Sequence, residues 1–225
     1  MDITKVYDVF VSQLMNRNGF ISEDNVRLYW FASMLKQDNN LNNYSLEEPY
    51  NPNVPGGKEF DLMYDDGIER WCIEIKFHRN PYNQIFAHPD SAGKMFDDMR
   101  RLTGWNGGDG NGKPTRYFFL YVTDDEMHRY LSNSSKRKGI YRRNLADFYG
   151  LAVGAQFKGT FEFAPNGDTP SSFMKRAYYS APFVLNRLDI SNIFLLKRDD
   201  IHCPSKSMQK TQSNINCHIR LYEIK

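Results

Sequence analysis

Apolar side chains recur at the three- and four-residue spacing of one helical face through the first part of the chain. The pattern predicts a helix over residues 4–17 and a second one from about residue 22 to 36. Ser22 is suited to cap the second helix, because its hydroxyl can accept a hydrogen bond from a free backbone N–H of the first turn. The positions expected to be buried are Val6, Val9, Phe10 and Leu14 in the first helix and Val26, Tyr29, Trp30 and Met34 in the second.

A different pattern follows in EFDLMYDDGIERWCIEIKF, where apolar and polar residues alternate on either side of Asp66-Gly67. The alternation predicts strands over residues 59–64 and 70–77, and the Asp-Gly dipeptide predicts a tight turn that joins them as a hairpin. With a two-residue loop, the expected cross-strand pairs are Leu62 with Trp71 and Phe60 with Ile73 on an apolar side, and Asp61 with Cys72 and Glu59 with Glu74 on the other.

The rest of the chain predicts further strands and helices. A continuous apolar run, RYFFLYV at residues 116–122, is typical of a central strand. Thr123 and Glu126 form a T-x-x-E capping box, which predicts a helix directly after that strand. The other expected elements are a strand near residues 44–48, a helix over 91–103 with Met95, Phe96, Met99 and Leu102 on one side, a helix near 142–152, strands near 157–163 and 193–197, and a terminal strand in CHIRLYEIK. Residues 165–182 are expected to be a long connection.

The strand expected at residues 70–77 has two very different faces. Its apolar face is formed by Trp71, Ile73, Ile75 and Phe77, and its other face by Cys72, Glu74, Lys76 and His78. One interpretation of the second face is that it is solvated, with Glu74 and Lys76 as a surface pair. The other interpretation is a functional site.

The functional interpretation rests on the acids of the hairpin. In the expected register Asp61 is diagonal to Glu74, and like charges this close destabilise a strand pair by a few tenths to about 1 kcal/mol. A divalent cation would turn that cost into a binding site, since magnesium and manganese prefer hard oxygen ligands. Lys76 is expected on the same side, where an ammonium can orient an attacking water. The set therefore suits hydrolysis of a phosphodiester.

Asp61 in EFD and Glu74-Ile75-Lys76 in CIEIKF, with twelve residues between the two acids, resemble the motif of the PD-(D/E)XK nuclease superfamily, which includes restriction endonucleases and DNA-repair nucleases. The resemblance covers about half of the chain. It implies an α/β, restriction-endonuclease-like fold, with a mixed central β-sheet flanked by helices and an α-β-β-β-α-β core. It also implies that Asp61, Glu74 and the Ile75 carbonyl hold Mg²⁺ or Mn²⁺, and that Lys76 acts on the attacking water. Family members often carry a further acid on the first core helix, where Glu23 is the candidate.

Several of these residues have alternative interpretations. Glu23 would be favoured by the helix dipole in a first turn, and Arg27 one turn later could pair with it. The same tripeptide pattern recurs at residues 223–225, without a hairpin or a facing acid. The proline of the family motif is replaced by Phe60, which leaves Asp61 in place. Glu48, Glu59 and His78 are expected to be surface groups rather than metal ligands.

The composition is that of a folded protein, with 40% hydrophobic and 15% aromatic residues in a chain of 225. We expect one nuclease-like domain over residues 1–225, with its core at about 22–122 and a C-terminal elaboration at about 123–225. No run of 18 uncharged apolar residues and no charged leader with an apolar core is present, so neither a membrane nor export is expected. Three cysteines at unrelated spacings suit the cytoplasm.

Net charge is only +2, but residues 128–143, HRYLSNSSKRKGIYRR, contain no acid. We call this segment the basic block; it is either solvated surface or a phosphate-binding surface for DNA, the expected partner. Its residues expected to bind nucleic acid are Lys136, Arg137, Lys138, Arg142 and Arg143. A symmetric homodimer is a further hypothesis, because cutting both strands of a duplex needs two active sites.

The function expected from these patterns is a magnesium-dependent endodeoxyribonuclease of restriction or repair type. Two alternatives stay open. The first is a nucleic-acid-binding module that keeps the fold without the chemistry, and the second is a metal-dependent hydrolase that acts on another substrate. The pairs His202-Cys203 and Cys217-His218 match none of the usual zinc spacings, so no zinc site is expected.

Overall fold

The structure is a computed structural model, and it describes residues 1–16, 22–50, 58–78, 95, 98–99, 101–102, 105, 112–132, 149–152, 154–162, 180–187, 193–202 and 209–224. Its elements are α1 (Ile3–Met15), α2 (Glu23–Leu35), the 3₁₀ helix η1 (Leu41–Asn43), β1 (Tyr44–Pro49), β2 (Glu59–Asp65), β3 (Arg70–His78), β4 (Thr115–Asp124), α4 (Asp125–Ser132), β5 (Gln156–Glu162), β6 (Ser180–Arg187), β7 (Ile193–His202) and β8 (Gln209–Ile224). Residues 95, 98, 99, 101 and 102 are helical. The chain is therefore mixed α/β, and the two N-terminal helices and the four strands β1 to β4 lie where the sequence predicted them.

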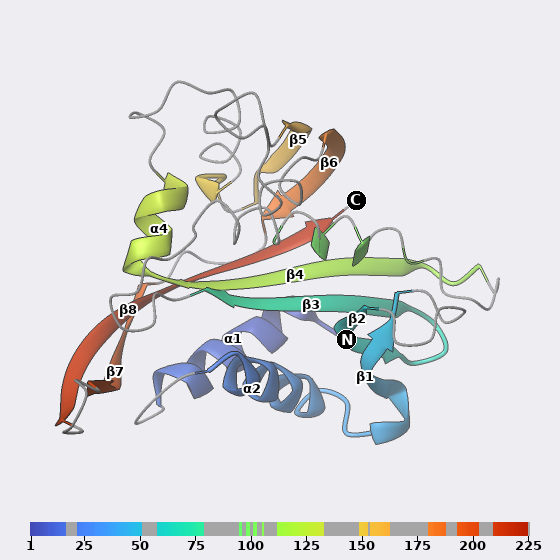
Figure 1. Ribbon diagram of the computed structural model, residues 1–225. Coiled ribbons are helices and arrows are strands. Elements are labelled where there is room, and N and C mark those ends of the chain that lie inside the picture. Colours follow the sequence, from blue (N-terminus) through green and yellow to red (C-terminus); the bar gives the residue numbers. More distant parts are fainter. Residues whose placement is uncertain are drawn as a thin grey trace.

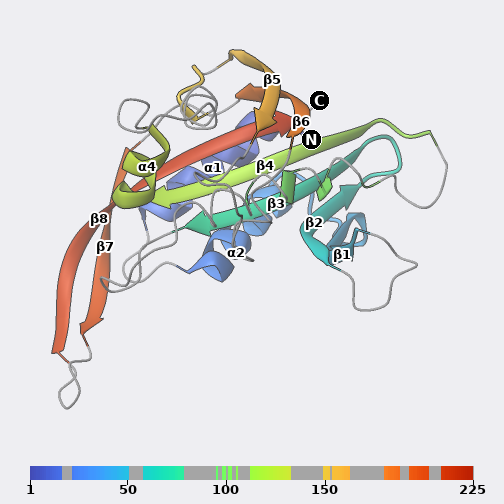
Figure 2. The same cartoon turned by 45° about the horizontal axis from the view of Figure 1, so that its top comes forward.

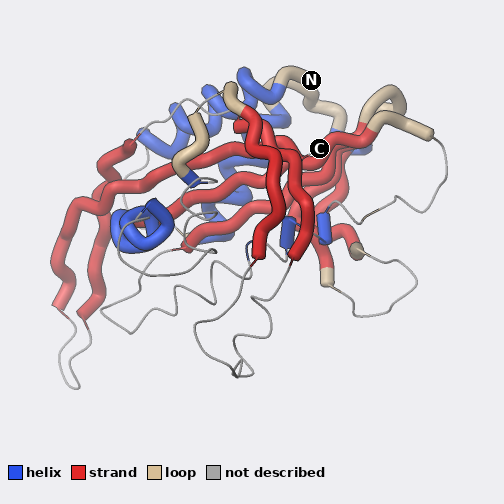
Figure 3. The backbone as a smooth tube through the Cα atoms, turned by 90° about the horizontal axis from the view of Figure 1, so that it is seen from above, coloured by secondary structure: helices blue, strands red, loops and turns tan. Residues whose placement is uncertain are grey.

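The described strands form one sheet in the order β1-β2-β3-β4-β8-β6-β5, with β7 paired to another stretch of β8. β3 and β4 are parallel and the remaining pairs are antiparallel, so the sheet is mixed. Figure 1 shows α1 and α2 on one side of the central strands and α4, β5 and β6 on the other. The β7–β8 hairpin extends beyond the other strands (Figure 2). From above, α4 is seen nearly end-on over the end of the sheet next to that hairpin (Figure 3).

The first core lies between the sheet and the two N-terminal helices. The whole apolar face of β3, Trp71, Ile73, Ile75 and Phe77, is buried here as predicted, next to Leu62 and Tyr64 of β2. Phe10 of α1 meets Trp30 of α2 edge to face, with ring centroids 5.3 Å apart. This core fixes the position of α2, and with it the start of that helix, against β3.

A second core lies on the opposite face of the sheet. Its members include Cys72 of β3, Phe119 and Tyr121 of β4, Tyr222 of β8, the helical residues Met95, Met99 and Leu102, and Trp105. Glu74, which points to this face, is only 2% exposed. The interpretation of this face as a solvated surface is therefore wrong, because Met95, Met99, Leu102 and Trp105 pack in the core on this face.

The register of the hairpin differs from the expected one. The observed pairs are Leu62 with Ile73, Met63 with Cys72, Tyr64 with Trp71 and Asp65 with Arg70. The predicted pairs of Leu62 with Trp71 and Asp61 with Cys72 are therefore wrong by two residues. A shift of two keeps each side chain on its face. The pairing ends at Leu62 and Ile73, so Asp61 lies just beyond the last paired residue of β2.

The turn itself explains the shift. The Asp66 carboxylate accepts hydrogen bonds from the backbone N–H groups of Ile68, at 2.8 Å, and Glu69, at 2.9 Å. Gly67 takes a φ of +88°, which residues with a side chain rarely adopt. Together they close a loop of four residues, 66–69, instead of the predicted two, because an aspartate side chain can replace a backbone acceptor in a turn.

The strand β2 changes faces near its start. Glu47 in β1 has a φ of +55°, and the pairing between β1 and β2 skips it. On one side of this irregularity Leu62 lies in the first core, and on the other Phe60 is buried in the second core against Trp105. The expected placement of Phe60 on the apolar side with Ile73 is therefore wrong.

The helix after β4 begins later than predicted. α4 starts at Asp125, and its first turn is capped by Asp124, whose Oδ1 accepts a hydrogen bond of 2.9 Å from the N–H of Met127. The predicted capping box at Thr123 is wrong, because Thr123 belongs to β4 and its hydroxyl lies 3.0 Å from that of Tyr149. Thr123 stays in the strand because it is paired with His78 of β3 on one side and with His218 of β8 on the other.

The C-terminal part was predicted less completely. The expected strands near 157–163 and 193–197 and the terminal strand are confirmed as β5, β7 and β8, and the last two are longer than expected. β6 was not predicted, since its first residues fall in the stretch expected to be a connection. The helix expected near 142–152 and the residue Phe96 lie largely or wholly outside the described residues.

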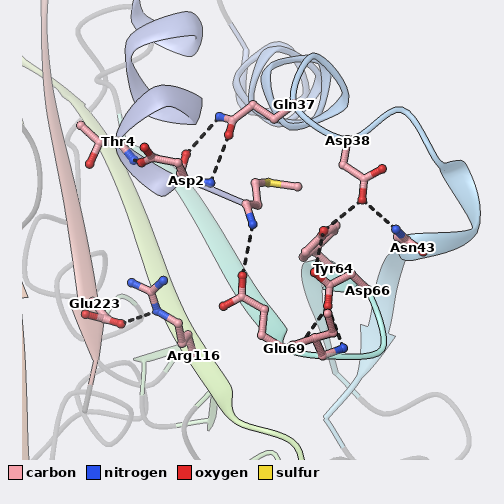
Figure 4. A network of polar contacts seen from close by, with 12 residues as sticks. Asp2, Thr4, Gln37, Asp38, Asn43, Tyr64, Asp66, Glu69, Arg116 and Glu223 are labelled. Atoms are coloured by element: carbon pink, nitrogen blue, oxygen red, sulfur yellow. Dashed lines mark hydrogen bonds and ion pairs between the residues drawn. The ribbon is translucent and has the colours of Figure 1, made fainter.

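A polar network ties the far end of the hairpin to α2 (Figure 4). The Tyr64 hydroxyl lies 3.0 Å from Asp38 Oδ2 and 3.1 Å from Asp66 Oδ2, and Asn43 donates to Asp38 at 2.7 Å. In the same view, Arg116 of β4 donates to Glu223 of β8 at 2.7 Å. Glu223, the acid of the second tripeptide match, is thus a partner in a strand-to-strand ion pair.

Among the described residues, no helix is long and apolar enough to cross a membrane.

Candidate functional site

Asp61 lies where β2 and β3 separate. The pairing of these strands ends at Leu62 and Ile73, so the N–H of Ile75 has no β2 carbonyl to bind. The Asp61 carboxylate takes that place, with Oδ2 accepting the hydrogen bond at 2.6 Å. Its side chain is only 9% exposed. A carboxylate is therefore held at this opening of the sheet by the backbone of β3 itself.

The first turn of α2 brings a second acid and a cation to the same place. Ser22 caps the helix, as predicted, with its hydroxyl accepting a 3.2 Å hydrogen bond from the N–H of Asn25. Glu23 then reaches β3, where its Oε2 accepts a 3.2 Å hydrogen bond from the N–H of Phe77. Arg27 bridges the two acids, at 2.8 Å from Glu23 Oε1 and 2.7 Å from Asp61 Oδ1. The expected pairing of Glu23 with Arg27 is present, and it extends to Asp61.

Glu74 sits one residue before Ile75 and points into the second core. Its Oε1 lies 2.9 Å from the Lys76 ammonium, and its Oε2 accepts a 3.1 Å hydrogen bond from the Tyr50 hydroxyl. Burial and the charge of Glu74 raise the pKa of Tyr50, so the hydroxyl remains a donor. Both oxygens of a nearly inaccessible carboxylate are therefore engaged, as a buried charge requires.

Lys76 has a second acidic partner that the sequence did not indicate. Its ammonium lies 3.4 Å from Asp98 Oδ2, and Arg101, one turn along the same helical segment, also pairs with Asp98. The Arg101 guanidinium in turn lies over the Tyr50 ring, 5.3 Å from its centroid. The segment between β3 and β4 therefore holds Lys76 beside Glu74 from the side opposite to α2.

The acids of this cluster disturb one another electrostatically. The pKa of Asp61 is raised to about 7, first by burial and then by the charge of Glu74, while Arg27, the N–H of Ile75 and Lys76 act in the opposite direction. Asp61 therefore keeps a raised pKa although the cations Arg27 and Lys76 lie nearby.

A divalent cation fits this donor set. No group of three or more histidine, cysteine, aspartate or glutamate side chains in the described part of the chain is arranged to hold a metal. Magnesium, however, is usually bound through one or two carboxylates, with water and substrate phosphate as further ligands. Asp61, Glu74 and the backbone carbonyl of Ile75 supply such hard oxygens. The raised pKa of Asp61 also marks a place where added positive charge would be stabilising.

The structure brings together Glu23, Asp61, Glu74 and Lys76, and the sequence had singled out all four. The sequence analysis did not identify Asp98 or Tyr50, because no local pattern gives a signal for them. It also did not predict the ion pair between Arg27 and Asp61. Of the residues expected to be surface groups, Glu59 is exposed, Glu48 contacts Ser45, and the His78 ring lies 2.8 Å from the Tyr121 hydroxyl. The five basic-block residues expected to bind nucleic acid all lie outside the described residues.

The histidines of the pairs His202-Cys203 and Cys217-His218 can also be placed. His202 is opposite Gln209 and His218 is opposite Ile193, at the two ends of the β7–β8 hairpin. These histidines are therefore far apart along the strands.

The chain was also compared with known proteins. No protein-family model, no curated protein and no solved structure matches it.

Proposed function

We propose that this protein is a magnesium-dependent endodeoxyribonuclease with a restriction-endonuclease-like fold. The observation that carries the proposal is that Asp61, at the opening between β2 and β3, lies near enough to Glu74 for the charge of Glu74 to raise its pKa, with Lys76 directly beside Glu74. The element order supports the fold, because α2, β1, β2, β3, the helical residues 95–102 and β4 follow the α-β-β-β-α-β order that the resemblance implies.

The roles of the residues follow from their contacts. When bound by Asp61, Glu74 and the Ile75 carbonyl, magnesium would polarise a phosphate oxygen and lower the pKa of a bound water. Lys76 holds a positive charge at the same place, and its ammonium protons can orient the attacking water. Asp98 positions Lys76, because its carboxylate contacts the Lys76 ammonium and is itself paired with Arg101.

Glu23 and Arg27 position Asp61 rather than touching the substrate. Glu23 is fixed by the N–H of Phe77, and Arg27 spans the gap from Glu23 to Asp61. Two hydrogen-bonded anchors leave the Asp61 carboxylate little rotational freedom, which reduces the cost of organising a metal site. One oxygen of the Asp61 carboxylate contacts the backbone N–H of Ile75 in β3, and the other contacts Arg27 in α2. Both partners therefore belong to regular elements.

A second candidate function has its own observation. Arg27 already pairs with Asp61 and Lys76 with Glu74, so the buried acids have counter-charges without any metal. A nucleic-acid-binding module that has lost the chemistry would keep such pairs for stability alone. The third alternative, a hydrolase of another substrate, keeps the metal but not the DNA.

Nicking of supercoiled plasmid separates these functions. Wild-type protein should nick plasmid with magnesium or manganese and not in chelator, and Lys76→Ala should lower the rate at least about a hundredfold. The matched control is Lys5→Ala, which removes an exposed lysine of α1 and should keep the rate. DNA binding without nicking would favour the binding module, and neither activity would favour another substrate. Double-strand breaks made by a strict monomer would contradict the proposed homodimer.

A further inference from the structure

A pocket opens beside Asp61 on the side of α2. Its volume is about 330 Å³, at the low end of the range of small-molecule sites. It lies between α2, β1 and β2, and its lining residues are Arg27, Leu28, Phe31, Leu46, Glu47 and Asp61. A volume of this size admits one flat group rather than a strand or a helix.

The walls of the pocket combine apolar and acidic groups. Leu28 and Leu46 are 58% and 59% exposed, and Phe31 is half-buried, so three apolar side chains offer surface to a ligand. Glu47 and Asp61 supply two carboxylates. The one cation, Arg27, is already paired with Asp61 and Glu23.

The charge of the pocket restricts its ligand. Two carboxylates and a neutralised guanidinium repel a phosphate group but accept hydrogen bonds from amino groups. A ligand that fits therefore has a flat apolar body for Phe31 and the leucines, and an amino edge for Glu47. A nucleobase with an exocyclic amino group has both properties.

The position of the pocket indicates which nucleotide of the substrate would supply the base. Asp61 belongs both to the lining of the pocket and to the candidate metal site. A nucleotide whose phosphate is bound at Asp61 therefore has its base within reach of the pocket. A base in an intact duplex is stacked and paired, so only an unpaired one can enter.

We propose that this pocket receives one unpaired, amino-bearing nucleobase next to the phosphate that is cut. The proposal rests on the proposed function and gives it a substrate class: single-stranded DNA, or duplex DNA that is locally opened. Cytosine, adenine and guanine carry the required amino group and thymine does not. Glu47 is then a specificity residue, and Phe31 is the stacking surface.

Binding in chelator tests the pocket apart from any chemistry. Fluorescence anisotropy would compare labelled oligonucleotides of dC and of dT, two pyrimidines of similar size; cytosine has an amino group at C4 where thymine has a carbonyl, and thymine also has a C5 methyl group. Wild-type protein should bind the dC strand at least about tenfold more tightly, since hydrogen bonds to charged groups are worth this much. Glu47→Gln should remove the preference, and Phe31→Ala should weaken both strands about tenfold.

One control and a second pocket variant allow the result to be interpreted. Leu41→Ala removes a leucine that is 63% exposed and lies outside the pocket, and it should change nothing. Because Phe31 also touches Tyr44 edge to face, its loss could disturb the fold. Leu46→Ser avoids this problem, since Leu46 is already exposed, and it should weaken strand binding while duplex binding stays the same.

The outcomes separate the pocket from the nuclease. Equal affinity for dC and dT, or a preference that Glu47→Gln leaves intact, would overturn the pocket even if plasmid is nicked. A preference that depends on Glu47 in a protein that never nicks would keep the pocket and remove the nuclease. Competition by free dCMP at the concentration of the strand itself would assign the pocket to free nucleotides and overturn its role in strand binding.

Discussion

At the scale of single residues, the proposed chemistry depends on carboxylates that are buried yet not fully compensated. Glu74 satisfies both oxygens with Tyr50 and Lys76, whereas Asp61 shares Arg27 with Glu23, and its pKa is raised by burial and by the charge of Glu74. A group of this kind is a common feature of functional sites, where burial and a like charge are arranged to shift an acid toward neutral pH.

The raised pKa of Asp61 predicts a pH dependence of stability. An acid whose pKa is about 7 when folded, against 3.8 ordinarily, binds its proton more tightly in the folded protein. It therefore contributes stability at acidic pH, and this contribution is lost as the pH rises through 7. Asp61→Asn should remove the loss. From pH 4 to 7.5 its free energy of unfolding should gain at least about 1 kcal/mol relative to wild type.

Urea unfolding at several pH values measures this difference. The matched control is Asp8→Asn on an exposed position of α1, whose difference from wild type should stay constant over the same range. Magnesium should raise the wild-type melting temperature more at pH 7.5 than at pH 5, because protons compete for Asp61. Asp61→Asn should lose most of that gain. A difference that is flat with pH, or an equal magnesium effect in both proteins, would contradict the site.

At the scale of elements, periodicity located α1, α2 and the strands β1 to β4 because each has a local cause. Their apolar residues repeat at the period of the element, and Ser22 supplies a cap that can be recognised from the sequence. The hairpin register could not be predicted in the same way. It depends on which backbone groups the Asp66 side chain binds, and that choice is set by geometry in the loop. Periodicity can therefore assign each side chain of the hairpin to a face of the sheet, but it cannot identify the residue opposite it on the other strand.

The candidate site shows the same limit. Asp61, Glu74 and Lys76 were identified because they are charged residues that alternate with apolar residues along two predicted strands. Asp98 was not found, since it meets Lys76 only after the segment between β3 and β4 folds over the sheet. Contacts between elements distant in sequence leave no periodic signal, and the burial of Glu74 is of this kind.

The N-cap of α2 gives a prediction at this scale. Ser22 accepts the N–H of Asn25, and the Asn25 side chain returns a 3.2 Å contact to the N–H of Ser22. Ser22→Ala should lower the free energy of unfolding by about 1 kcal/mol, and Ser22→Gly by only a few tenths. Urea unfolding checks both. Equal losses from alanine and glycine would show that the hydroxyl is not what stabilises the helix start.

At the scale of the whole molecule, the sheet joins the two ends of the described chain. β8 lies between β4 and β6 and continues the second core with Tyr222. α1 covers the first core beside α2. The expected core at about 22–122 therefore omits a helix and a strand that complete it, because sequence periodicity reveals an element but not its neighbours in a sheet. The ends of β3 and β4 that carry Lys76 and Thr123 point toward the same edge, since these strands are parallel.

The basic block gives the prediction for the whole molecule, because its first residues belong to α4 and α4 begins at that edge. If the block lies along the DNA, Arg142→Ala with Arg143→Ala should weaken binding to all sequences and reduce the slope of log affinity against log salt by up to about two units. Lowering the net charge alone could also weaken binding. The matched control is therefore Lys5→Ala with Lys36→Ala, which removes two equally charged, exposed side chains of the N-terminal helices. The control should keep the wild-type slope. Equal slopes for the two double variants would show that the block acts only through net charge, or is solvated surface.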